Sequence, residues 1–131
     1  MTPPPFAVGI GAERSVSAAE IAALVHGTLT THGISTSEIA CFASLDSKRH
    51  EPAFHELART LGVPIHFFAA ATLNAEAPRL QNPSPRVEAL TGVPGVAEAA
   101  ALAAAGPGSV LVVPKTKSAR ATCAIARRAE P

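Results

Sequence analysis

The 131-residue chain contains no tryptophan and no tyrosine, and only 16% of its residues are charged. Without these aromatic rings it lacks the platforms on which single-stranded nucleic acids stack their bases. Its formal net charge of +1 provides no general attraction for a polyanion. We therefore expect no nucleic-acid partner, and any basic function must be local.

Cysteine is also scarce, and neither Cys41 nor Cys123 belongs to a CxxC pair or a Cys/His spacing. Both lie in apolar segments, which indicates two buried thiols in a reducing compartment. The five histidines lack the spacing of metal ligands, so we expect neither a metal nor another cofactor. No signal-peptide pattern is evident, and no apolar run approaches the roughly 20 residues that span a bilayer. These absences predict a cytoplasmic protein without a membrane partner.

Apolar residues are abundant, at 47% of the chain, which is enough for the core of one domain. A capping-box pattern at Ser17-Ala-Ala-Glu20 predicts a helix that ends near Gly33. Further helices are expected from Pro52 to residue 61 and from Pro94 to residue 105. Between 70 and 90 we expect a short helical turn, a loop and one more turn. Strands are predicted at 6–10, 39–45, 63–69, 110–113 and 122–125.

Alternation of strands and helices favours parallel pairing with right-handed crossovers, whereas the last two strands can pair antiparallel. The predicted fold is a single compact three-layer α/β domain over residues 1–131. It has a mixed, mostly parallel sheet of about five strands with helices on both faces. The proline-rich residues 1–5 are expected to be frayed.

In such sheets, ligands bind beyond the carboxyl ends of the strands. Three segments are expected at that edge, namely residues 9–17, 44–51 and 115–120. Gly9 and Gly11 do not form a dinucleotide fingerprint, because the third glycine is missing. They would let backbone approach a ligand, or they simply form a tight strand-to-helix turn.

The densest polar cluster holds Ser44, Asp46, Lys48 and Glu51. It could bind a polar ligand or perform acid–base chemistry. Alternatively, Asp46 or Ser47 caps a helix and the charges are solvated.

Charged residues in the last third of the chain form a second candidate group. Glu98 is the only charge in an Ala-rich helix, where it either complements the helix dipole or is directed at a site. Lys115, Lys117 and Arg120 could bind carboxylates or phosphates, or could be a solvated hairpin tip.

Five segments in this order resemble one family: VGIG at 8–11, ASLDSKRHEP at 43–52, LGVPIHFF at 61–68, GVPGVAEAAAL at 92–102 and LVVPKTKSARATCAIA at 111–126. The chain is similar to the CobE and CbiG C-terminal domain family of cobalamin (vitamin B12) biosynthesis. The resemblance implies a compact α/β domain that acts on or binds corrin-ring intermediates. It also implies a ligand-facing set of Gly9, Gly11, Ser44, Lys48, Glu51, Glu98, Lys115 and Thr122.

Two departures from the family are visible. Fused CbiG proteins carry a preceding domain and open a lactone on the ring. We expect no such domain here, so the resemblance does not transfer the hydrolase activity. Many relatives also have a cysteine directly after the GIG turn, where this chain has Ala12.

The expected function is the binding of a precorrin or related macrocycle, as a carrier, a protector or an accessory to a ring-modifying step. Corrin intermediates are flat and fringed with carboxylates, which a basic edge beside an apolar surface suits. One alternative is an enzyme that hydrolyses or rearranges the ring, with Glu98 or Glu51 as the acid–base. Another is a docking module for a pathway methyltransferase, using the Ala-rich helix. The expected ligand-binding residues are Gly9, Gly11, Ser44, Asp46, Lys48, Glu51, Glu98, Lys115, Lys117, Arg120 and Thr122.

Overall fold

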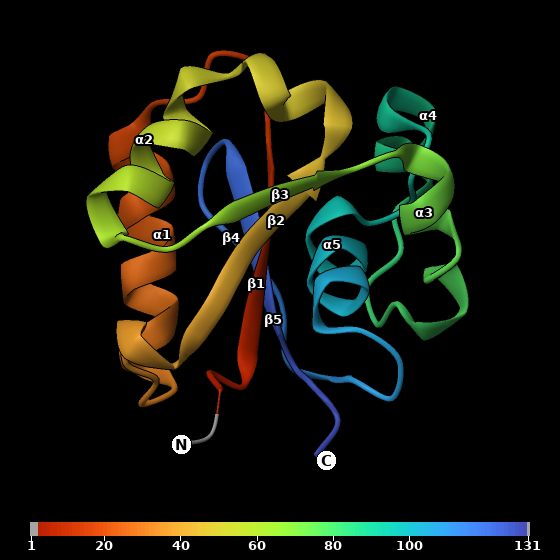
Figure 1. The fold of residues 1–131 in the computed structure, drawn as a ribbon. Coiled ribbons are helices and arrows are strands. Elements are labelled where there is room, and N and C mark those ends of the chain that lie inside the picture. The colour runs from red at the N-terminus through yellow and green to blue at the C-terminus, as the bar shows by residue number, and fades with distance from the viewer. Residues whose placement is uncertain (1–2, 131) are drawn as a thin grey trace.

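The computed structural model describes residues 3–130, in which five strands form one sheet in the order β3-β2-β1-β5-β4 (Figure 1). β1 pairs in parallel with β2, and β2 with β3, whereas β5 pairs antiparallel with both β1 and β4. β5 alone therefore runs against the other four strands, which confirms a mixed, mostly parallel sheet. The strands are β1 (Phe6–Ala12), β2 (Ile39–Leu45), β3 (Ile65–Phe68), β4 (Val110–Lys117) and β5 (Ala121–Arg127). The expectation that residues 1–5 are frayed falls partly on residues 1 and 2, outside the described residues.

Helices cover both faces of this sheet, as predicted (Figure 1). α1 (Ala18–Thr31) and α2 (Pro52–Leu61) lie on one face. α3 (Ala70–Asn74), α4 (Pro85–Thr91) and α5 (Val96–Ala105) lie on the other. Short 3₁₀ helices are η1 (Thr36–Glu38), η2 (Asp46–His50) and η3 (Ala77–Arg79). Within residues 3–130 no single helix is long and apolar enough to cross a membrane; α4 and α5 would meet that criterion only as a pair, which is bent by 75°.

α5 packs very closely on the sheet because the residues in contact are small. A Cβ added to Gly9 would lie 1.9 Å from the backbone oxygen of Ala97, so only glycine fits at that point of β1. Ala100 and Ala101 are completely buried. The hypothesis that this helix docks a partner through those alanines is therefore wrong, because their face is already covered by the protein's own core.

Local sequence signals set most helix ends. Ser17 caps α1 by accepting a hydrogen bond from the Glu20 N–H at 3.1 Å, but the Glu20 carboxylate binds elsewhere, so only half of the predicted capping box forms. Pro52 begins α2, and Gly62 ends it with a left-handed φ of 67°. The predicted role of Pro94 in a first helical turn is wrong. α5 begins only at Val96, after its N-cap Gly95.

The two final strands are longer than predicted. β4 continues past residue 113, so Lys115 and Lys117 lie on a strand and not in a loop. The turn between β4 and β5 is residues 118–120 only, of which Arg120 is the basic member. β4 is longer because it pairs with β5. The pairing of Lys117 with Thr122 continues the β4–β5 hydrogen-bonded ladder beyond the β-branched residues from which the strand was predicted.

Candidate functional site

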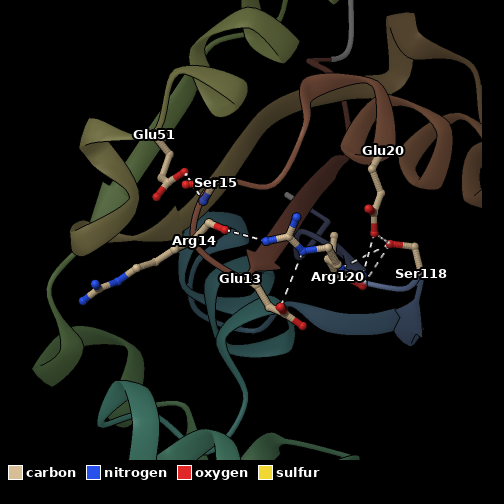
Figure 2. A network of polar contacts seen from close by, with 8 residues as sticks. Glu13, Arg14, Ser15, Glu20, Glu51, Ser118 and Arg120 are labelled. Atoms are coloured by element: carbon tan, nitrogen blue, oxygen red, sulfur yellow. Dashed lines mark hydrogen bonds and ion pairs between the residues drawn. The ribbon is translucent and has the colours of Figure 1, made fainter.

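The three segments predicted to meet at one edge of the sheet do meet there. β1 and β2 end at this edge, and the antiparallel β5 begins there, opposite the end of β4. The Ser15 N–H donates to Oε1 of Glu51 at 3.0 Å, joining the loop after β1 to the start of α2. Arg120, in the turn before β5, contacts the same loop from the opposite side (Figure 2).

Arg120 is the principal contact of the loop at residues 13–16. Its Nη2 donates to the carbonyl oxygen of Arg14 at 2.8 Å, and its Nε lies 3.5 Å from Oε1 of Glu13. The Glu13 N–H in turn donates to the Arg120 carbonyl at 2.9 Å. Arg120 was predicted as a ligand-binding cation, but its guanidinium is occupied in holding this loop.

Glu20, at the start of α1, holds the turn between β4 and β5. Its Oε2 accepts from the Arg120 N–H at 2.6 Å and from the Ser118 hydroxyl (Figure 2). The hydrogen bonds from Ser118 and Arg120 hold the pKa of this carboxyl below its ordinary value. The same carboxylate was expected to complete a capping box, and the turn competes successfully for it.

Glu98 is buried, with only 1% of its surface exposed, and its carboxylate accepts four hydrogen bonds. Oε1 accepts from the N–H groups of Gln81 and Asn82 at 2.8 and 2.9 Å. Oε2 accepts from the Asn82 side chain and from the Lys115 N–H, both at 2.9 Å. Burial opposes the charge, but the hydrogen bonds from Asn82, Lys115 and Gln81 outweigh it and hold the pKa of Glu98 below its ordinary value. These contacts tie three chain segments together, which favours a structural role.

Several residues of the predicted ligand-facing set lie within the sheet. Gly9 and Gly11 are buried, and the Ser44 hydroxyl, which is completely buried, donates to the Ile10 carbonyl at 2.6 Å. Thr122 Oγ1 is 3.4 Å from the Gly11 carbonyl oxygen. In this structure each of these residues serves the packing of β1 against its neighbours.

The remaining predicted residues are charged and reach solvent at this edge. Asp46 is exposed and pairs with Arg49 at 2.5 Å. Lys48 is half-buried; burial lowers its pKa, Glu51 opposes that effect and the charge of Arg14 adds to it. Lys115 Nζ makes one long contact, 3.4 Å to the Asn82 carbonyl, and Lys117 is exposed.

The acids and the lysines of this edge therefore differ in whether other groups of the protein contact them. Among the described residues, the carboxylates of Asp46, Glu51 and Glu98 are each held by the protein's own donors. Lys48 and Lys117 form no ion pair within residues 3–130. No group of three metal-ligating side chains occurs in that same range. The acids of this edge are consequently engaged within the protein, whereas these two lysines are not ion-paired among the described residues.

Sequence reasoning placed residues 9–17 at this edge but named none of Glu13, Arg14, Ser15 and Glu20 as a site residue. Glu13 to Ser15 were visible only as part of a polar turn after the first strand. Ser15 has a φ of 60°, which a non-glycine residue rarely adopts and which no sequence signal announces.

A twisted sheet with helices on both faces and a polar edge at the strand ends defines an α/β protein of the doubly covered type. Residues 6–126 match the family model described as Cobalamin synthesis G C-terminus. The chain therefore belongs to this family of the cobalamin (vitamin B12) biosynthetic pathway, as the resemblance of its segments implied.

Two curated proteins and three solved structures show how this chain relates to the family. It is 47% identical to Protein CobE of Sinorhizobium sp over 91% of this chain and 77% of that protein. It is 31% identical to Cobalt-precorrin-5A hydrolase of Priestia megaterium over 95% of this chain, but over only 32% of that protein.

A crystal structure of CobE, a protein from the cobalamin biosynthetic pathway, superposes with a TM-score of 0.91 at 42% identity, covering 96% of this chain and 95% of that one. The chiG protein of Agrobacterium tumefaciens str. C58 gives a TM-score of 0.73 at 28% identity, covering 95% of this chain and 99% of that one. A cobalamin biosynthesis protein G homologue from Sulfolobus solfataricus gives 0.77 at 25% identity, covering 98% of this chain but only 38% of that one.

Proposed function

We propose that this protein binds a corrin-ring (precorrin) intermediate at the carboxyl edge of its sheet, as a carrier, a protector or an accessory to a ring-modifying step. The observation that carries the proposal is the unequal use of charge at this edge. Its acids are held by internal donors, whereas Lys48, Lys115 and Lys117 are without a carboxylate partner among the described residues. Corrin intermediates carry several carboxylates, and lysines bind such groups by charge-assisted hydrogen bonds.

An enzymatic function is the alternative, because one relative is named as a hydrolase. Under that alternative, Glu98 or Glu51 would transfer a proton. Glu98 accepts four hydrogen bonds, and Glu51 holds the Ser15 amide, so an acid–base role would require either carboxylate to leave its structural partners. This geometry favours binding over catalysis.

A carrier must also pass its ligand on, so we expect transient contact with another enzyme of the pathway. We expect the protein to act in the cytoplasm. The two cysteines are free and buried, and a reducing compartment would keep them as thiols.

The test is a visible-absorbance titration of the protein with precorrin-type and late corrinoid intermediates, followed by mass analysis of the recovered ligand. A saturable spectral change with an unchanged ligand mass is the expected result. A change in ligand mass on turnover would show that the protein is an enzyme. The absence of a spectral change with every intermediate would refute ring binding and leave a protein–protein role.

A double variant separates the lysines from the fold. Lys115→Ala with Lys117→Ala removes two charges but keeps the Lys115 N–H that Glu98 accepts. We expect ring affinity to fall by about 10-fold or more, the scale of one lost charge-assisted contact. Arg127→Ala with Arg128→Ala is the matched control, because it removes the same charge at the opposite end of β5. Equal affinities for the two double variants would show that the lysines are only part of a solvated hairpin.

A further inference from the structure

Arg14 has an unusual position at the edge of the sheet. It lies in the loop after β1, is exposed, and directs its side chain away from the polar network that surrounds its own backbone (Figure 2). Its guanidinium makes no hydrogen bond or ion pair within residues 3–130. A large cation is thus placed in solvent by a loop whose backbone is held at the Glu13 N–H, the Arg14 carbonyl and the Ser15 N–H.

The loop that carries Arg14 is braced from two sides. Arg120 donates to the Arg14 carbonyl at 2.8 Å, and the next N–H, that of Ser15, donates to Glu51 at 3.0 Å. Ser15 itself has the left-handed φ of 60°. L-residues adopt that conformation only where surrounding contacts compensate for it, so these contacts define the direction in which Arg14 leaves the backbone.

Lys48 is the second cation of the same surface. It follows β2 as Arg14 follows β1, and these two strands are parallel neighbours. The contact between Ser15 and Glu51 brings the two loops together. Arg14 is close enough for its charge to help lower the pKa of Lys48, in addition to the larger effect of burial.

Like charges near one another disfavour each other's charged form, and a nearby acid offsets that effect. Glu51 is the acid whose charge acts on Lys48, but its Oε1 is already held by the Ser15 amide. No carboxylate of the described chain forms an ion pair with Arg14 or Lys48. Lys48 therefore has one nearby acid, Glu51, and neither cation has an ion-pair partner of its own among the described residues.

We propose that Arg14 and Lys48 together hold one carboxylate of the ligand, with Arg120 and Glu51 acting as positioning residues for the loop. This inference rests on the proposed function and adds Arg14, which lies outside the lysine set tested above. The planar guanidinium offers two parallel N–H donors to a carboxylate, and the ammonium adds a point charge. Because the loop backbone is braced before the ligand arrives, the ordering cost of binding falls mainly on the cationic side chains.

The experiment compares two probes, a corrin ring with free acetate and propionate carboxylates and the same ring as its methyl ester. Arg14→Ala is expected to weaken binding of the free acid by about 10-fold or more. It should leave binding of the ester unchanged, because the ester has no charge to lose. Arg14→Lys should retain part of the affinity, since lysine keeps the positive charge but lacks the two parallel N–H donors of the guanidinium. Arg127→Ala, an exposed arginine at the opposite edge, is the control and should bind both probes as the unsubstituted protein does.

The outcomes separate the two proposals. If the unsubstituted protein binds the free acid and Arg14→Ala binds it equally well, the two-cation site is refuted and ring binding stands. If the unsubstituted protein binds neither probe, both proposals fail. Misfolding is not expected to obscure the result, because the Arg14 side chain has no contact to lose and its carbonyl remains available to Arg120.

Discussion

Glu98→Gln separates a structural carboxylate from a catalytic one. The substitution conserves shape and removes only the charge and one acceptor oxygen. A residue that acts solely as an acid–base would lose activity and leave the free energy of unfolding unchanged. The structure predicts instead that the free energy of unfolding falls, because the carboxylate holds the fold together.

The magnitude follows from the four donors that converge on this carboxylate. A glutamine oxygen can accept from two of them, and its NH₂ group then faces the other two N–H groups. Two donors of part-buried hydrogen bonds thereby lose their partner, each at a cost of up to about 1–3 kcal/mol. We therefore expect the free energy of unfolding to fall by about 2–6 kcal/mol, a large share of the roughly 5–15 kcal/mol of an ordinary domain.

Urea unfolding at pH 7 measures this loss, and hydrogen exchange at the Asn82 and Lys115 amides locates it. Glu88→Gln is the matched control, since Glu88 also lies in the first turn of a helix but is exposed. It should change stability by less than about 0.5 kcal/mol. A loss below about 1 kcal/mol in Glu98→Gln, with unchanged exchange at both amides, would refute the structural interpretation.

Acid should have the same effect on the unsubstituted protein. The pKa of Glu98 is lower in the folded state than its ordinary value of 4.5. Its stabilising contribution is therefore complete above that value and is lost as the pH falls through the folded-state pKa. The difference in stability between the protein and Glu98→Gln should accordingly be largest near neutral pH and shrink below pH 4.5.

Two other predictions concern the core. Gly9→Ala should destabilise the fold by about 3 kcal/mol or more, because the new methyl group would meet the Ala97 carbonyl oxygen. Gly27→Ala, in an open position of α1, should instead stabilise the fold by about 0.5–1 kcal/mol. Urea unfolding compares the two variants, and similar free energies of unfolding would contradict the close packing of α5 on β1. Cys41 and Cys123 should react with a thiol reagent only after unfolding, because both are buried and burial raises their pKa, so rapid labelling of the folded protein would contradict the structure.

Much of the fold could be predicted from residues that are near one another in sequence. Ser17 caps a helix, Pro52 begins one and Gly62 ends one, because each restricts the backbone or satisfies it locally. The alternation of strands and helices then leaves few right-handed topologies, and it placed the carboxyl edge correctly. These signals act over a few residues and are readable without a structure.

The use of each polar group depends on contacts between residues distant in the chain. Ser44 and Glu98 look like site residues in sequence, yet strand order turns the first towards Ile10 and encloses the second among the backbone of residues 81, 82 and 115. Arg120 is 106 residues from the carbonyl it holds. By itself, the sequence determined most of the secondary structure, the family and the charged edge, but not where β4 ends or where α5 begins. Only the tertiary structure decided which charges are satisfied internally and which are left without a partner among the described residues, because a carboxylate's partners are set by strand order and register.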